Sequence, residues 1–150
     1  MLNSIRALIL PLLLLLPVAE NVEAAPQPLS ETWKLYTDRY PVITYSDLKQ
    51  AMREGNITLL DANSPTTYNN GHIPGALSLP ALIKKEEKRP LPSSKNDLVV
   101  VYCGGPQCSA WFKAADFVVK KGYKTIRYYR GGLKEWKAKE EPVETGDRTR

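Results

Sequence analysis

Apolar and polar residues alternate along the chain in blocks that predict strands followed by helices. Residues 98–102 read Leu-Val-Val-Val-Tyr, an apolar run on both faces that is typical of a central strand in a parallel sheet. Further strands are predicted at residues 42–44, 57–61, 76–79 and 124–129. Helices are predicted at residues 47–54 after an N-cap at Ser46, in a short turn from Ser64-Pro65, and from an N-cap at Ser109 to Lys121. This alternation indicates an α/β fold with a mostly parallel, five-stranded sheet.

The N-terminus has the pattern of a secretory signal. Arg6 precedes an apolar run from Ala7 to Leu16, and Val22-Glu23-Ala24 places small residues where a signal peptidase cleaves. The run is shorter than the roughly 20 apolar residues that a membrane span needs. We therefore expect a signal peptide over residues 1–24, cleaved near Ala24/Ala25, and a secreted or periplasmic protein with no stable membrane span after cleavage. The alternative is an uncleaved N-terminal anchor.

The remaining chain is expected to form one domain with short extensions. Residues 25–40 are interpreted as an arm, either extended or a short irregular helix, residues 41–143 as the domain, and residues 144–150 as a disordered tail. With 43% hydrophobic and 25% charged residues, the composition is that of a globular protein. The net charge of +5 is spread over scattered lysines without interleaved aromatic residues, so no nucleic acid partner is expected.

Cys103 is the candidate for chemistry because of its position. It follows the predicted central strand and precedes a predicted helix, at the sheet edge where open α/β folds bind ligands. The next residues, Gly104, Gly105 and Pro106, favour a tight loop whose backbone N–H groups surround an anion. The expected substrate- or anion-binding loop consists of Gly104, Gly105, Pro106, Gln107, Cys108 and Ser109. The same field lowers the pKa of a thiol, and the thiolate is the nucleophile. The alternative is a buried structural cysteine.

Four segments, in order along the chain, resemble the rhodanese-like domain family. They are Leu59-Leu60-Asp61, Tyr68 to Ala76 with its Gly-His-Ile-Pro-Gly turn, Val100-Val101-Tyr102-Cys103, and Tyr129 to Trp136 with its Gly-Gly-x-x-x-Trp pattern. The resemblance covers residues 42–142 and implies a three-layer α/β/α fold. It also implies a sulfurtransferase that forms a persulfide on Cys103 from a small-molecule or protein-bound sulfane sulfur donor. The sulfur then passes to a thiol or other acceptor, and no cofactor is needed.

The sequence departs from common family members at three places. Asn63 and Thr67 stand where many members have an Arg and a Glu, and Cys108 stands where many have an Arg that binds an anionic donor. The chain therefore resembles a subgroup with a Cys-x-Gly-x-x-Cys loop, formed by Cys103 to Cys108 with Gln107 before the second cysteine. The missing cation puts thiosulfate in doubt as the donor, although Lys113 is expected to reach the mouth of the loop.

Three residues have more than one interpretation. Cys108 can form a disulfide with Cys103, act as a resolving thiol, or pack passively. His72, the only histidine, is interpreted as a structural hydrogen-bonding residue and alternatively as a base. Asp61 is interpreted as the cap of a turn under the loop and alternatively as an active-site acid.

The second function considered is a non-catalytic sulfur or metal carrier, or an exported redox partner that uses the Cys103/Cys108 pair. Two cysteines and one histidine are too few for a four-ligand zinc site, so no metal is expected. Trp33, Trp111 and Trp136 are interpreted as packing residues, with Trp111 as a candidate to line the loop mouth.

Overall fold

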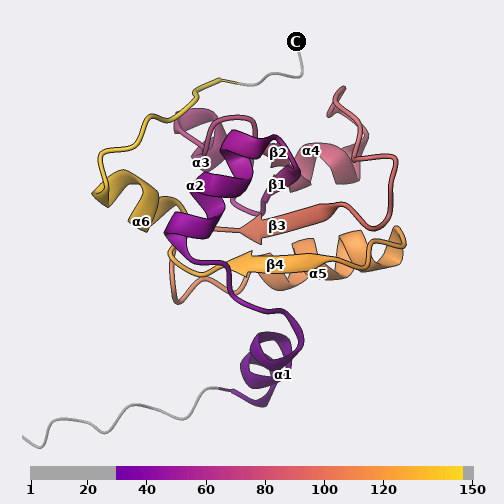
Figure 1. Cartoon of the computed structure of the whole chain (residues 1–150). Coiled ribbons are helices and arrows are strands. Elements are labelled where there is room, and N and C mark those ends of the chain that lie inside the picture. The colour runs from indigo at the N-terminus through magenta and orange to yellow at the C-terminus, as the bar shows by residue number, and fades with distance from the viewer. Residues whose placement is uncertain (1–29, 147–150) are drawn as a thin grey trace, which may run out of the picture.

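The computed structural model describes residues 30–146 of the chain (Figure 1). The expected signal peptide at residues 1–24 lies outside these residues. The helices are α1 (Glu31–Arg39), α2 (Tyr45–Glu54), α3 (Pro65–Asn70), α4 (Leu79–Lys84), α5 (Trp111–Lys120) and α6 (Gly132–Ala138). The strands are β1 (Ile57–Asp61), β2 (Leu77–Ser78), β3 (Leu98–Tyr102) and β4 (Ile126–Tyr129).

The strands form one parallel sheet in the order β2-β1-β3-β4. The apolar strand β3 lies between β1 and β4, as its sequence predicts. Asp61 at the end of β1 is in register with Tyr102 at the end of β3, which in turn is in register with Tyr129 of β4. All strands point the same way, so the residues that follow them meet at one edge of the sheet.

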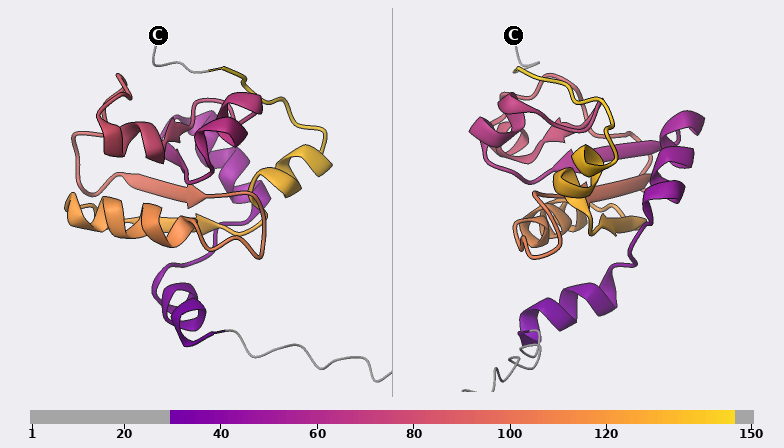
Figure 2. Two further views of the ribbon diagram at one scale, coloured as in Figure 1. Left: turned by 180° about the vertical axis from the view of Figure 1, so that it is seen from behind. Right: turned by 90° about the vertical axis from the view of Figure 1, so that its left-hand side faces the viewer.

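Helices cover both faces of this sheet, which gives the three-layer fold that the resemblance implies (Figure 2). Val99 and Val101 of β3 face a cluster that contains residues of α4 and α5, among them the fully buried Trp111. Val100 and Tyr102 point to the opposite face, which α2 and α6 cover. The alternation of side chains along β3 thus divides the core into two parts.

The fifth predicted strand, at residues 42–44, is reduced to a single parallel bridge between Val42 and Tyr128. Two causes lie in the neighbouring residues. Pro41 has no N–H for a ladder, and Thr44 already caps α2, since its side-chain oxygen accepts a hydrogen bond from the N–H of Asp47. The sheet of the described residues therefore has four strands.

The ends of the described chain are more ordered than their sequences indicate. Ser30 caps α1, so part of the expected arm is a regular helix, and Tyr36 stacks on Phe112 of α5 with ring centroids 4.2 Å apart. At the other end, residues 147–150 of the expected disordered tail lie outside the described residues, and the expectation is wrong for its first residue, Glu144. Glu144 exchanges two backbone hydrogen bonds with His72, so this segment is fixed to the domain.

Two predicted helix caps are wrong. The N-cap of α2 is Thr44 instead of Ser46. Helix α5 begins at Trp111 without a side-chain cap, and Ser109 contributes only its backbone carbonyl, which accepts from the N–H of Phe112 at 3.0 Å. In residues 30–146, no helix has the length and apolar character that a membrane crossing requires.

Candidate functional site

The loop from Cys103 to Ala110 joins the end of β3 to the start of α5, at the edge where the parallel strands end. Cys103 is only 1% exposed and belongs to the core cluster on the α5 face. The neighbouring strand contributes its backbone as well, because the N–H of Ala62 donates to the carbonyl oxygen of Tyr102 at 2.9 Å. The base of the loop is therefore fixed by the sheet.

The start of α6 holds the other side of this loop. The N–H groups of Leu133 and Lys134 donate to the carbonyl oxygens of Cys103 and Gly104, both at 2.9 Å. Gly132, which precedes them, has a φ of +56°. A Cβ at this position would collide with the carbonyl oxygen of Cys103, so only glycine permits the close approach. The Gly-Gly turn thus positions the loop.

In the described residues, backbone carbonyl groups of the loop accept hydrogen bonds, whereas several of its backbone N–H groups donate none. The Gly105 carbonyl accepts from the N–H of Cys108 at 3.0 Å, so three consecutive carbonyls, from Cys103 to Gly105, have donors. Among the described residues, the N–H groups of Gly104, Gly105 and Gln107 donate to no acceptor. An anion bound at this loop would find unused donors there.

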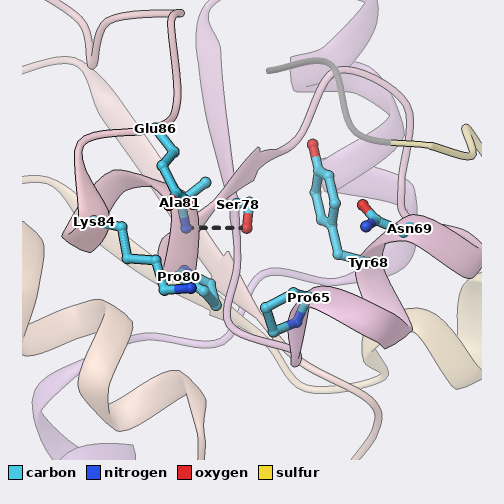
Figure 3. A pocket seen from close by; sticks show the side chains of 8 residues that line it. All are labelled: Pro65, Tyr68, Asn69, Ser78, Pro80, Ala81, Lys84 and Glu86. Atoms are coloured by element: carbon cyan, nitrogen blue, oxygen red, sulfur yellow. Dashed lines mark hydrogen bonds between the residues drawn. The ribbon is translucent and has the colours of Figure 1, made fainter. Parts of the chain in front are cut away.

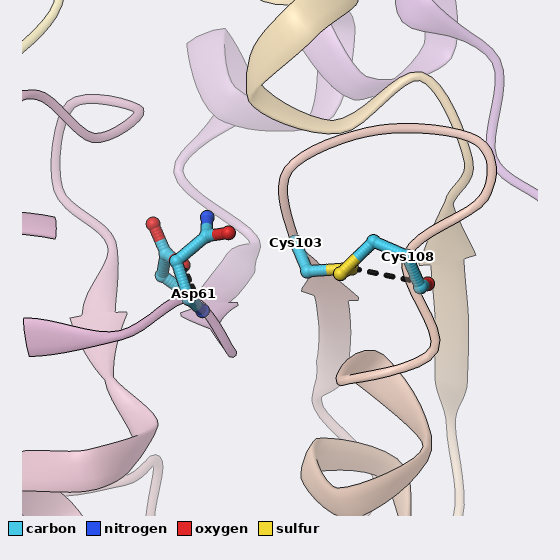
Figure 4. The surroundings of a disulfide bond; sticks show 4 residues. Asp61, Cys103 and Cys108 are labelled. Carbon is cyan, nitrogen blue, oxygen red and sulfur yellow. Dashed lines mark hydrogen bonds between the residues drawn. A yellow bond between two sulfur atoms is a disulfide. The ribbon is translucent and has the colours of Figure 1, made fainter. Parts of the chain in front are cut away.

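Cys103 and Cys108 are joined by a disulfide bond in this structure (Figure 4). Their Cα atoms are 6.2 Å apart, within the usual range for a disulfide. Cys103 is buried, whereas Cys108 is partly exposed. The bond therefore presents the Cys108 side to an incoming reagent.

A hollow of about 330 Å³ lies over the loop. Its lining consists of Gly104, Gly105, Pro106, Gln107, Cys108 and, from α6, Lys134. The Lys134 side chain lies against Gly105, so a cation borders this hollow. Lys113, the cation expected from the sequence, lines a different groove. Lys134 was missed because its proximity depends on the packing of α6 against the loop.

Asp61 lies at the end of β1, next to β3, and is completely buried (Figure 4). Its Oδ1 accepts a hydrogen bond from the N–H of Asn63 at 2.7 Å, which closes a turn just after the strand. Its Oδ2 and the Nδ2 of Asn63 have no hydrogen-bond partner in residues 30–146. Burial raises the pKa of the Asp61 carboxyl, although the Asn63 N–H opposes this effect. The geometry matches the capping role more closely than an acid that contacts a ligand.

His72 lies away from the hollow, after the end of α3. Its ring stacks on Tyr68 with centroids 3.7 Å apart, and its Nδ1 is 2.9 Å from the Tyr68 carbonyl oxygen. Its Nε2 is 3.5 Å from a carboxylate oxygen of Glu144. The residue is fully buried and links α3 to the C-terminal segment. This is the structural role that the Gly-His-Ile-Pro-Gly turn favours.

The remaining candidates lie outside the hollow. Trp111 is fully buried, and its ring stacks on that of Tyr128 with centroids 3.9 Å apart. It therefore does not line the mouth of the loop. Ser109 is exposed but is not part of the lining of the hollow.

A second pocket, between α3 and α4 (Figure 3), has a volume of only about 60 Å³, enough for a few waters.

Comparison with known proteins assigns this arrangement to a family. The sequence matches the rhodanese-like domain over residues 44–139. Mouse thiosulfate sulfurtransferase/rhodanese-like domain-containing protein 3 is 28% identical over 131 residues, which cover 77% of this chain and 82% of the mouse protein. The HTH-type transcriptional regulator Rv0324 of Mycobacterium tuberculosis is 27% identical, over 69% of this chain and 45% of that protein. The chain therefore spans less than half of the mycobacterial relative.

Solved structures show the same fold. The BH2092 protein of Bacillus halodurans superposes with a TM-score of 0.58 at 26% identity, over 77% of this chain and 85% of that one. The human single-domain sulfurtransferase TSTD1 superposes with a TM-score of 0.55 at 24% identity, over 66% of this chain and 96% of the human protein. With a family match over more than half of its length, the chain belongs to the rhodanese-like domain family.

Proposed function

We propose that the protein is a sulfurtransferase that carries sulfur as a persulfide on Cys103. The observation that carries this proposal is the loop after β3, where a buried cysteine is followed by backbone N–H groups of Gly104, Gly105 and Gln107 that find no acceptor in residues 30–146. Free amides and the start of the ten-residue helix α5 favour negative charge at the sulfur. Two relatives named as sulfurtransferases, from mouse and Allochromatium vinosum, support the reaction class.

The first half-reaction needs the reduced form of the site. The Cys103 thiolate attacks the outer sulfur of a sulfane donor, and the bond between the two donor sulfurs breaks with its electron pair. With thiosulfate as the donor, sulfite leaves and a persulfide anion remains on Cys103. Charge balances, because a thiolate and a dianion become a persulfide anion and a dianion. The free loop amides would hold the terminal sulfur anion.

The second half-reaction has two routes. An external thiolate attacks the terminal sulfur, takes it as a new persulfide and releases the Cys103 thiolate. Alternatively, the Cys108 thiol attacks the inner sulfur, which forms the Cys103–Cys108 disulfide and releases hydrosulfide. The disulfide in the structure supports the second route. Two electrons from an external thiol reductant must then reopen the site, and the partly exposed Cys108 is the sulfur it reaches first.

The disulfide also favours a second candidate function, a thiol–disulfide carrier or redox partner. In that role the Cys103–Cys108 bond would be the working group, and no sulfur atom would leave with the acceptor. The two functions differ in one product, since only the sulfurtransferase generates a persulfide.

The proposal includes export. The apolar run at residues 7–16 and the small residues before Ala25 support a signal peptide, and an oxidising compartment favours the disulfide. Protein recovered from the periplasm should begin at or near Ala25. Recovery of only the full-length chain in the cytosol would contradict export.

A turnover assay tests the activity. The reduced protein is given thiosulfate or an uncharged organic trisulfide, with cyanide as the acceptor, and thiocyanate is measured. The proposal expects thiocyanate above the enzyme-free background from the wild type with at least one donor. Cys103→Ser should give no more than that background, which arises because cyanide also takes sulfur from a trisulfide directly. A wild type that is inactive with both donors, while its disulfide cycles with a dithiol, would favour the redox carrier.

A further inference from the structure

A groove of about 360 Å³ adjoins the Cys103–Ala110 loop and shares no lining residue with the hollow that Lys134 borders. It is bounded by the turn after β1, by α4 and by the beginning of α5, so it lies at the sheet edge where Cys103 is found. Two of its lining residues join it to the loop. Asn63 points its Oδ1 toward Gly104, and Ala110 is two residues after Cys108. An occupant of the groove would therefore lie beside the loop that carries Cys103.

The groove is lined by apolar and basic side chains. Its apolar residues include Leu79, Pro80 and Ile83, and the Ile83 side chain is 58% exposed. A contiguous apolar surface with polar residues around it is typical of contact sites, and Leu79, Pro80 and Ile83 line this one groove together. The charged residues of the lining are Lys84 and Lys113, both exposed, and neither makes an ion pair with another described residue. No carboxylate lines the groove.

We infer that this groove docks the sulfur-accepting protein, through a segment that carries an apolar side chain, flanking carboxylates and the acceptor cysteine. The inference rests on the proposed function, since it identifies the partner of that site. The apolar side chain would cover Ile83, and the carboxylates would face Lys84 and Lys113. A second copy of this chain fits less well, because its net charge of +5 would repel the two lysines. A small groove suits a carrier, which must release its acceptor after transfer.

Three synthetic cysteine peptides test the inference. One carries glutamates and a leucine near the cysteine, the second replaces the glutamates by glutamine, and the third replaces the leucine by serine. Cys103 is first loaded from an uncharged trisulfide, whose central sulfur its thiolate attacks with loss of one organic thiolate. One equivalent of added thiol then removes the remaining organic thiol as a disulfide and leaves a persulfide on Cys103. After donor and thiol are removed, the rate of persulfide discharge is measured. The acidic leucine peptide should react about tenfold faster than either other peptide at low salt. The advantage over the glutamine peptide should shrink at high salt, because exposed charges are screened.

Matched variants separate the groove from general charge effects. Lys84→Glu with Lys113→Glu should abolish the preference for the acidic peptide, whereas Lys120→Glu with Lys124→Glu, an equal change of charge away from the groove lining, should preserve it. Ile83→Ser should abolish the preference for leucine over serine. All variants should lose sulfur to cyanide at the wild-type rate, because cyanide needs no docking. Equal rates for the three peptides, or equal effects of the two charge reversals, would overturn the inference.

A binding measurement keeps the two proposals distinguishable. The acidic leucine peptide with its cysteine replaced by serine should shift the NMR methyl signal of Ile83 in the wild type, with or without a persulfide. If cyanide removes no sulfur from Cys103 but this shift is seen, the sulfurtransferase proposal fails and the docking groove stands. No shift, or a dimer that Ile83→Ser dissolves, would overturn the groove as an acceptor site.

Discussion

The N–H of Leu133 donates a hydrogen bond to the carbonyl oxygen of Cys103 at 2.9 Å. This contact connects the first turn of α6 to the residue that follows the central strand. It explains why the Gly-Gly turn at the start of α6 belongs to the site although it is almost thirty positions further along the chain. Gly132 permits this contact, because any larger residue would push the loop away.

Replacing Gly132 by alanine should displace the loop and reduce persulfide formation at least tenfold. The left-handed backbone at Gly132 alone should cost about 1–2 kcal/mol of stability in a residue with a Cβ. Gly55→Ala is the matched control, since Gly55 also has a positive φ but nothing lies within 4 Å of its missing Cβ. Gly55→Ala should lower the free energy of unfolding through strain only and leave sulfur loading unchanged. Equal sulfur loading in both variants would show that the loop tolerates the displacement.

Asp61→Asn should stabilise the protein at neutral pH. Burial raises the pKa of Asp61 above its ordinary value of 3.8, so the folded state favours the protonated carboxyl. The contribution of this carboxyl to the free energy of unfolding is therefore fully present below pH 3.8. It is lost as the pH rises through the pKa of Asp61 in the folded state. The free energies of unfolding of wild type and Asp61→Asn should therefore diverge as the pH rises, with the variant the more stable. Parallel curves between pH 3 and 7 would show that the carboxyl is not perturbed.

Lys134→Gln should weaken the use of thiosulfate, because Lys134 is the cation that borders the hollow over the loop. The KM for thiosulfate should rise about fivefold, the size expected for one exposed charge contact, and the KM for an uncharged trisulfide should stay the same. Lys113→Gln provides the comparison, since Lys113 lines the other groove. If Lys113→Gln raised the KM for thiosulfate more than Lys134→Gln did, Lys113 would be the cation at the mouth of the loop, as the sequence predicts.

Cys108→Ala should lengthen the life of the persulfide. Without Cys108, the inner sulfur has no internal thiol to attack it, so hydrosulfide should be released more slowly after a single loading. The measurement is the persulfide remaining over time by cyanolysis, with thiol counting after air oxidation. Two results together would show that Cys108 is a packing residue. The persulfide of Cys108→Ala would decay at the wild-type rate, and both thiols of the wild type would stay free after air oxidation.

Much of the fold follows from sequence pattern. The apolar run at residues 98–102 indicates the central strand, and Ser64-Pro65 indicates the start of α3, whose N-cap is Ser64. Helix α4 was not predicted, although Ser78 followed by Leu79-Pro80 is a helix start and the Ser78 side chain does cap it. The strand pattern up to Leu79 obscured that signal. The strand predicted at residues 42–44 does not form beyond a single bridge, although it contains apolar residues. Pro41 before it has no N–H to donate, and Thr44 at its end serves as the N-cap of α2.

The candidate site was less predictable than the fold. Cys103 and its glycines are adjacent in sequence, so their loop can be expected from local pattern. Lys134 and Gly132 reach the loop only through the packing of α6, and Glu144 reaches His72 only because the C-terminal segment returns to α3. Contacts of this kind depend on tertiary structure, and no local pattern encodes them.

Mass spectrometry of the reduced protein, after one exposure to an uncharged sulfane donor, tests the central claim most directly. The account predicts an added mass of one sulfur atom on the peptide that contains Cys103, removed by cyanide, present in Cys108→Ser and absent in Cys103→Ser. Sulfur found on Cys108 in the Cys103→Ser protein, or no added sulfur in the wild type, would contradict it.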